Sequence, residues 1–98
     1  MKEINIEDIL KISNDINIID IRDRYLFDIE NIPGSINIPY NFLITNPDNY
    51  LDKNKEYYIY CNYGVNSKKI CIELTHKGYN VINLKGGFRT YKLMEHKI

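Results

Sequence analysis

Residues 56–67 read Glu-Tyr-Tyr-Ile-Tyr-Cys-Asn-Tyr-Gly-Val-Asn-Ser, an aromatic and β-branched run followed at once by a short polar loop. The run over 56–60 favours a strand, because such side chains suit a pleated, buried surface. Apolar residues then recur at helical spacing from about Val65 to Lys77, and Gly78 is typical of a helix C-terminal cap. These residues therefore predict a strand, a loop that begins with Cys61, and a helix.

Further strands and helices are expected before and after this unit in the sequence. Strands are predicted at 16–21, at 35–38 after the turn-forming Pro33-Gly34, and at 79–84. Helical segments are predicted at 4–12 with Asn5 as N-cap, at 25–29, as one or two turns within 40–54, and from Gly86-Gly87 to Met94. Strands that alternate with helices predict an α/β fold with a mainly parallel sheet and helices on both faces.

Cys61 and the pair Asp20 and Arg22 follow the ends of predicted strands, and the carboxyl ends of parallel strands are the usual place for a site. The loop after Cys61 leads into a helix, so its backbone N–H groups can point at the sulfur and, with the helix dipole, stabilise a thiolate. Gly64 would allow a positive φ in this loop. The same amides could hold the extra sulfur of a persulfide, which makes Cys61 the candidate nucleophile.

The bulk composition excludes several other function classes. The chain has 98 residues, enough for one domain, and 13 Lys plus Arg balance 13 Asp plus Glu. This balance gives no overall positive field for nucleic acid or an acidic membrane, so we expect a small-molecule or protein partner. The acidic start over residues 1–8 and the lack of a long apolar run predict a soluble, cytoplasmic protein whose cysteines stay reduced.

Four segments of this chain, in order, resemble the rhodanese family. Asp20-Ile21-Arg22 is similar to the family's Asp-x-Arg after the first core strand, and Glu30–Pro39 is similar to its Gly-His-Ile-Pro-Gly-Ala-Ile-Asn-Ile-Pro segment. Cys61–Ser67 resembles the family's Cys-x-x-Gly-x-Arg-Ser loop, and Leu84–Phe88 resembles its Leu-x-Gly-Gly-aromatic pattern. The resemblance extends over nearly the whole chain.

The resemblance implies a single rhodanese-like domain over 1–98 with about five strands. It also implies a sulfurtransferase in which Cys61 accepts a sulfane sulfur as Cys61–S–SH and passes it to a thiol, cyanide or protein acceptor. No metal or organic cofactor is implied. Asp20 and Arg22 would support the loop, and the remaining loop residues would bind the substrate: Asn62, Tyr63, Gly64, Val65, Asn66 and Ser67.

This chain departs from the family pattern at three places. Asn66 stands where active members commonly have Arg, Glu30-Asn31 replace Gly-His, and Tyr91 lies near the position of a frequent Trp. A charge-assisted hydrogen bond contributes about 1.5–3 kcal/mol against about 0.5–1.5 for a neutral one, so Asn66 can replace the geometry but not the charge. We therefore expect thiosulfate to be a poor donor and a glutathione persulfide or protein persulfide to be a better one.

Two other functions remain open from the sequence. A rhodanese-like binding or regulatory module that lost efficient catalysis would fit the missing arginine at position 66, although Cys61 and Gly64 argue against it. A related cysteine phosphatase or arsenate reductase is less favoured, because that family closes a loop one residue longer with Arg, and position 67 here is Ser.

The second cysteine and the histidines suit structural or surface positions. Cys71 falls on the apolar side of its helix, which predicts core packing rather than chemistry. His76 and His96 lie at no spacing that suggests a Cys-His pair or a metal site, so both are expected at the surface.

Three further features near the loop have two interpretations each. Arg22 would either support the loop or pair with a neighbouring Asp at the surface, where such pairs contribute little. Lys68 and Lys69 could attract an anion or simply form a solvated helix face. Tyr63 could cover the pocket or point outward.

Overall fold

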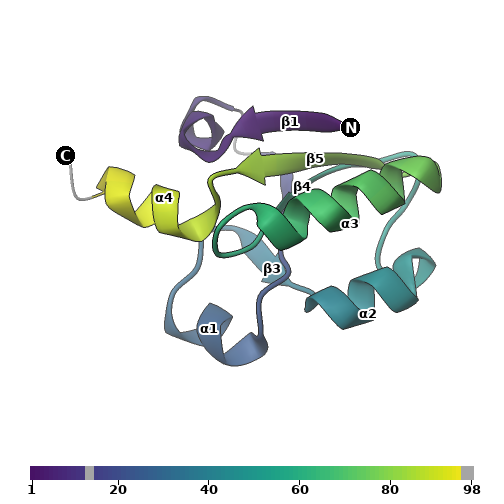
Figure 1. Ribbon diagram of the computed structural model, residues 1–98, viewed down its shortest axis with the longest axis horizontal. Coiled ribbons are helices and arrows are strands. Elements are labelled where there is room, and N and C mark those ends of the chain that lie inside the picture. Colours follow the sequence, from purple (N-terminus) through teal and green to yellow (C-terminus); the bar gives the residue numbers. More distant parts are fainter. Residues whose placement is uncertain (13–14, 96–98) are drawn as a thin grey trace.

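Figure 1 shows a computed structural model of the chain, which describes residues 1–12 and 15–95. One sheet contains five strands, all paired in parallel, in the order β1-β5-β4-β2-β3. The strands are β1 (Lys2–Asn5), β2 (Asn17–Asp20), β3 (Ser35–Asn37), β4 (Glu56–Tyr60) and β5 (Asn80–Lys85). The predicted α/β fold with a mainly parallel sheet is therefore confirmed.

A helical segment follows every strand, as the alternating pattern predicts. They are the 3-10 helices η1 (Ile6–Lys11) and η2 (Pro47–Asn49), and the α-helices α1 (Arg24–Ile29), α2 (Tyr40–Thr45), α3 (Val65–His76) and α4 (Gly87–Glu95). Gly78 follows α3 with a φ of 93°, as expected of a residue that ends a helix. Among the described residues, no helix combines the length and apolar character needed to cross a membrane.

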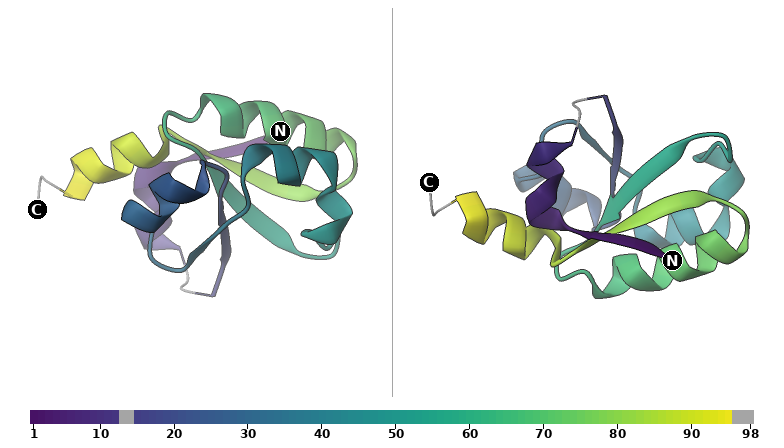
Figure 2. Two further views of the ribbon diagram at one scale, coloured as in Figure 1. Left: turned by 90° about the horizontal axis from the view of Figure 1, so that it is seen from below. Right: turned by 90° about the horizontal axis from the view of Figure 1, so that it is seen from above.

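The sheet is buried on both faces. In β4, Tyr57 and Ile59 belong to a core shared with α2 and α3, and Tyr58 and Tyr60 belong to a second core shared with η1 and α4. Figure 2 shows α2 and α3 on one side of the sheet and η1 on the other. Burial on both faces explains why the strand reads as a continuous aromatic and apolar run.

The prediction of a helix over 4–12 is wrong at residues 4 and 5. Residues 2–5 form β1, which pairs with β5 in the register Lys2↔Ile82 to Asn5↔Lys85, and only residues 6–11 turn into the 3-10 helix. Asn5 precedes this helix, but its side chain makes no capping hydrogen bond. The free edge of β5 supplies backbone partners that a local hydrophobic pattern does not reveal.

Candidate active site

Cys61 directly follows β4 and lies in a loop that folds around its sulfur. The residue is 4% exposed. The backbone N–H of Gly64 donates to Cys61 Sγ at 3.2 Å, and that of Ser67 donates at 3.3 Å. The thiol in turn donates to Ser67 Oγ at 3.3 Å. Two backbone donors and a hydroxyl therefore converge on Sγ, an arrangement that suits a thiolate or a bound anionic sulfur.

Gly64 is needed for the shape of this loop. It has a φ of 85° and stands as the N-cap of α3, so the chain enters the helix from a left-handed conformation. A Cβ at this position would lie 2.9 Å from the backbone nitrogen of Gly86. The loop thus reaches Sγ with its amides while it packs backbone against backbone on the end of β5.

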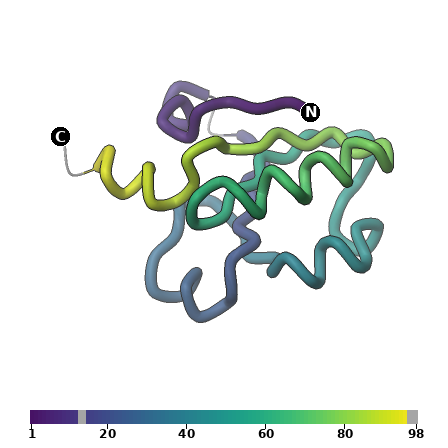
Figure 3. The backbone as a smooth tube through the Cα atoms, viewed as in Figure 1, coloured from purple at the N-terminus to yellow at the C-terminus, as the bar shows by residue number. Residues whose placement is uncertain are grey.

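The turn from β5 into α4 holds the other side of the loop. Phe88 N–H donates to the Cys61 carbonyl at 2.8 Å, and Arg89 N–H donates to the Asn62 carbonyl at 3.0 Å. A Cβ on Gly87 would meet the Asn62 carbonyl oxygen at 2.5 Å, so only glycine fits. Figure 3 shows this turn beside the loop that leads into α3. The consecutive glycines were predicted as a helix start, but their contact with the loop was missed.

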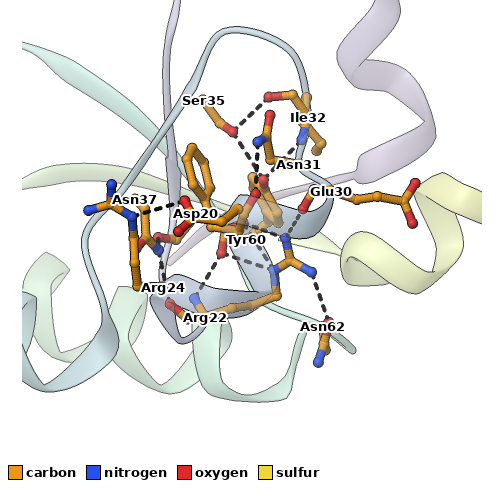
Figure 4. A network of polar contacts seen from close by, with 12 residues as sticks. Asp20, Arg22, Arg24, Glu30, Asn31, Ile32, Ser35, Asn37, Tyr60 and Asn62 are labelled. Carbon is orange, nitrogen blue, oxygen red and sulfur yellow. Dashed lines mark hydrogen bonds and ion pairs between the residues drawn. The ribbon is translucent and has the colours of Figure 1, made fainter.

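Asp20 and Arg22 form a buried ion pair under the loop, shown in Figure 4. Arg22 Nη2 lies 2.8 Å from Asp20 Oδ2, and the side chains are 6% and 0% exposed. Arg22 Nη2 also donates to the Glu30 carbonyl at 2.7 Å, and Nη1 contacts Asn62 Oδ1 at 3.4 Å. Arg22 therefore does not form a simple surface pair, as one interpretation held. Its guanidinium is buried and contacts the loop at Asn62.

The segment that resembles the family's Ile-Pro-Gly region is tied to the strand before Cys61. Tyr60 Oη accepts from the Ile32 N–H at 3.1 Å and lies 3.1 Å from Ser35 Oγ. Burial raises the pKa of Tyr60 well above its ordinary value, so the hydroxyl keeps its proton. Asn37 Nδ2 donates to the carbonyls of Asp20 and Arg22 at 3.0 and 2.9 Å. These bonds fix the strand ends that carry the site.

The other predicted loop residues differ in exposure. Asn62 is half-buried, whereas Tyr63, Val65 and Asn66 are exposed. Within the described residues, the Asn66 side chain makes no hydrogen bond to Sγ or to any other group. The Tyr63 ring points outward, and the Arg89 guanidinium lies 5.8 Å from its centre. The structure thus brings the backbone of the loop to the sulfur and leaves its exposed side chains around the rim.

Cys71 packs in the same core as Cys61, and no part of it is exposed. Burial raises the pKa of its thiol to about 12, so Cys71 remains protonated near neutral pH. The prediction of core packing is confirmed. His76 is exposed as predicted, and His96 lies outside the described residues. No three His, Cys, Asp or Glu side chains gather as metal ligands in the described part of the chain.

The chain matches known proteins over most of its length. The model of the rhodanese-like domain family matches residues 5–94. The thiosulfate sulfurtransferase GlpE of Coxiella burnetii is 32% identical over 79 residues, which cover 80% of this chain and 73% of that protein. A crystal structure of SSP1007 from Staphylococcus saprophyticus is 31% identical, with a TM-score of 0.82 over 93% of both chains.

A longer protein shares only a segment with this chain. The tRNA sulfurtransferase of Thermoplasma acidophilum is 36% identical over 67 residues, and these cover 68% of this chain but 13% of that protein. This chain therefore spans a small part of that relative. The family model covers nearly the whole sequence and the fold agrees with it, so the chain belongs to the rhodanese-like domain family.

Proposed function

We propose that this protein is a sulfurtransferase that carries sulfane sulfur as a persulfide on Cys61. The observation that carries the proposal is the convergence of the Gly64 and Ser67 amides on Cys61 Sγ, at 3.2 and 3.3 Å. Family membership and the relatives named as sulfurtransferases support the same chemistry. In this proposal residues 62–67 bind the substrate, with the exposed side chains of Tyr63, Val65 and Asn66 at the rim, and the Asp20–Arg22 ion pair supports the loop.

The first half-reaction loads the sulfur. The Cys61 thiolate attacks the outer sulfur of a donor R–S–SH, the new bond joins Sγ to that sulfur, and the donor's S–S bond breaks. The leaving R–S⁻ takes the electron pair, and the proton stays on the transferred sulfur. The two loop amides stabilise the thiolate before attack, and the Ser67 hydroxyl can rotate to donate to it as well.

The second half-reaction unloads the sulfur. An acceptor thiolate or cyanide attacks the outer sulfur of Cys61–S–SH, and the Cys61 thiolate leaves with the electron pair of the S–S bond that breaks. The proton of the outer sulfur stays on a persulfide product, and it passes to water when the product is thiocyanate. Neither half needs a metal, an organic cofactor or an external oxidant. We propose that one rhodanese-like domain over 1–98 performs this cycle in the cytoplasm, with a small-molecule or protein donor.

The proposed preference for persulfides over thiosulfate follows from the lack of a positively charged side chain in the loop. Thiosulfate transfers its outer sulfur and leaves as sulfite, whose negative charge develops beside Sγ. Asn66 is exposed and neutral, so within the loop only neutral donors, the backbone N–H groups and the Ser67 hydroxyl, face that charge. A persulfide leaves as a thiolate with less charge at that point. We therefore propose that low-molecular-weight or protein persulfides are better donors than thiosulfate.

Mass spectrometry of the intact protein tests the persulfide. After exposure to thiosulfate or glutathione persulfide, we expect one added sulfur atom, located on Cys61 by peptide mapping. Cys61→Ser should gain none, and Cys71→Ser should gain as much as the unchanged protein, because Cys71 is buried and protonated. A Cys61 that reacts with iodoacetamide but gains sulfur from no donor would overturn the proposal in favour of a rhodanese-like binding module.

A further inference from the structure

The Ser67 hydroxyl lies beside the candidate nucleophile in the interior of the protein. Ser67 is 0% exposed, and its Oγ lies 3.3 Å from Cys61 Sγ. Across residues 1–12 and 15–95, this sulfur is the only hydrogen-bond partner of the hydroxyl. Because a buried polar group needs a partner, the hydroxyl depends on the sulfur for its hydrogen bonding.

The direction of this hydrogen bond depends on the state of the sulfur. The thiol of Cys61 donates to Ser67 Oγ, and this bond leaves the hydroxyl's own hydrogen unused. A thiolate has no hydrogen to donate and only accepts, so the hydroxyl then rotates about its Cβ–Oγ bond and donates to Sγ. In that state the sulfur accepts from the Gly64 amide, the Ser67 amide and the Ser67 hydroxyl.

The persulfide state gains less from the hydroxyl than the thiolate does. In Cys61–S–SH, Sγ is a neutral sulfur bonded to carbon and to the outer sulfur, and such a sulfur is a weak acceptor. A hydrogen bond to an ionised group contributes more than one to a neutral group. The hydroxyl therefore gains strength as a donor while the S–S bond breaks and negative charge develops on Sγ.

We propose that Ser67 is a catalytic residue whose hydroxyl assists the departure of the Cys61 thiolate and thereby favours unloading over loading. The inference rests on the proposed sulfurtransferase function and assigns a role within it. In unloading, the acceptor bonds to the outer sulfur, the S–S bond to Sγ breaks, and the electron pair moves to Sγ, to which the hydroxyl donates. In loading, the same hydrogen bond holds the attacking thiolate and weakens as the new S–S bond forms. Ser67 keeps its proton in both halves.

Rapid-mixing kinetics of Ser67→Ala measures the two halves separately, with the mass of the acid-quenched protein as the readout. The persulfide form is mixed with glutathione to follow unloading, and the free thiol form is mixed with glutathione persulfide to follow loading. Both are measured at a pH at which Cys61 alkylation has reached its limiting rate. Unloading should be about three- to tenfold slower in the variant, because only part of the charge has developed when the bond breaks. Loading should be unchanged or faster. Equal slowing of both halves would overturn the proposal, since a displaced loop has that effect.

Two further variants keep this hydroxyl or remove a different one. Ser67→Thr retains a hydroxyl on the same Cβ, so the ratio of its unloading rate to its loading rate should stay near that of the unchanged protein. Ser35→Ala removes a hydroxyl that donates to the Ile32 carbonyl at 2.7 Å, outside the Cys61 loop. It should lower the melting temperature and leave the ratio of the two rates unchanged. The assignment fails if Ser67→Thr has the low ratio of Ser67→Ala, or if Ser35→Ala shares it.

Alkylation of Cys61 by iodoacetamide separates this inference from the proposed function, because it needs no sulfur donor. In Ser67→Ala, the pH at which alkylation reaches half of its limiting rate should rise by about one unit, since the thiolate loses a donor. Cys71 in the shared core and the Asp20–Arg22 pair under the loop are the same in both proteins. Such a rise without persulfide from any donor would uphold the hydroxyl's effect on the thiolate and reject the sulfurtransferase. Persulfide formation with an unmoved alkylation profile and an unchanged ratio of rates would do the reverse.

Discussion

The guanidinium carbon of Arg22 lies 4.2 Å from the centre of the Phe88 ring. Phe88 also donates its backbone N–H to the Cys61 carbonyl at 2.8 Å. One residue of α4 therefore contacts both the nucleophile's own backbone and the buried ion pair of Asp20 and Arg22. Because this pair also reaches Asn62, the first two residues of the loop are held from two sides.

Loss of the Arg22 side chain should cost far more stability than loss of a surface arginine. Arg22→Met leaves the fully buried Asp20 carboxylate without its counter-ion, and breaking a buried pair in this way typically costs about 3–5 kcal/mol. Arg24→Met is the control, because Arg24 pairs with Asp28 on an exposed helix face, where such a pair contributes about 0.3–0.5 kcal/mol. Urea unfolding measures both. Similar losses would contradict the assignment of a supporting role to Arg22.

Gly87→Ala should displace the Cys61 loop in addition to straining the backbone at a positive φ. Gly87 and Gly34 have φ values of 70° and 86°, so alanine is strained at both positions. Only at Gly87 would the new Cβ meet the Asn62 carbonyl oxygen, at 2.5 Å, whereas nothing lies within 4 Å at Gly34. We expect a lower melting temperature for Gly87→Ala than for Gly34→Ala, and a changed rate of Cys61 alkylation by iodoacetamide in Gly87→Ala alone. Equal alkylation rates would mean that the turn does not position the loop.

Stability should fall as the pH rises above about 8.5, the ordinary pKa of a cysteine. Burial raises the pKa of Cys71 to about 12, so the unfolded chain loses this proton first and the folded chain retains it. The free energy of unfolding therefore decreases between about pH 8.5 and 12, and the full contribution is present below this range. Raised pKa values of Tyr58, Tyr60 and Tyr91 act in the same direction at higher pH.

Cys71→Ala isolates the cysteine's share of this pH dependence. The variant starts from a lower stability at pH 7 because it leaves a cavity in the core, but its loss of stability between pH 8 and 11 should be smaller. Urea unfolding at several pH values gives both slopes. Parallel curves for the two proteins would show that Cys71 does not titrate as its burial implies.

The parts of the fold that are set by neighbouring residues were predictable, and the parts set by distant pairing were not. The strand at 56–60 and the helix from Val65 carry strong local patterns, and the structure confirms both. β1 escaped prediction because its partner β5 is far along the chain. The apolar alternation of Ile4 and Ile6 fits a strand and a helix equally over so few residues.

The same reasoning applies to the site. The position of Cys61 after a strand and before a helix was sufficient to predict amides directed at its sulfur, two of which the structure shows. The contacts of Arg22 with Asn62 and Phe88 depend on how three separate segments pack. The hydrogen bond from Asn83 Nδ2 to the Glu3 carboxylate likewise needs the β1–β5 pairing, which places Glu3 beside Asn83.

Asn66→Arg should improve thiosulfate as a donor. Asn66 lies exposed in the first turn of α3, and no other group in the described residues holds its side chain, so a guanidinium can be placed there without disrupting a contact. A charge-assisted hydrogen bond contributes about 1.5–3 kcal/mol, which corresponds to a rise of about ten- to a hundredfold in kcat/KM for thiosulfate. Asn66→Gln, which is longer but neutral, should leave this value nearly unchanged, and neither variant should alter the use of a neutral persulfide much. Steady-state kinetics with cyanide as acceptor would measure the effect, and an equal gain in the glutamine variant would show that length and not charge limits thiosulfate.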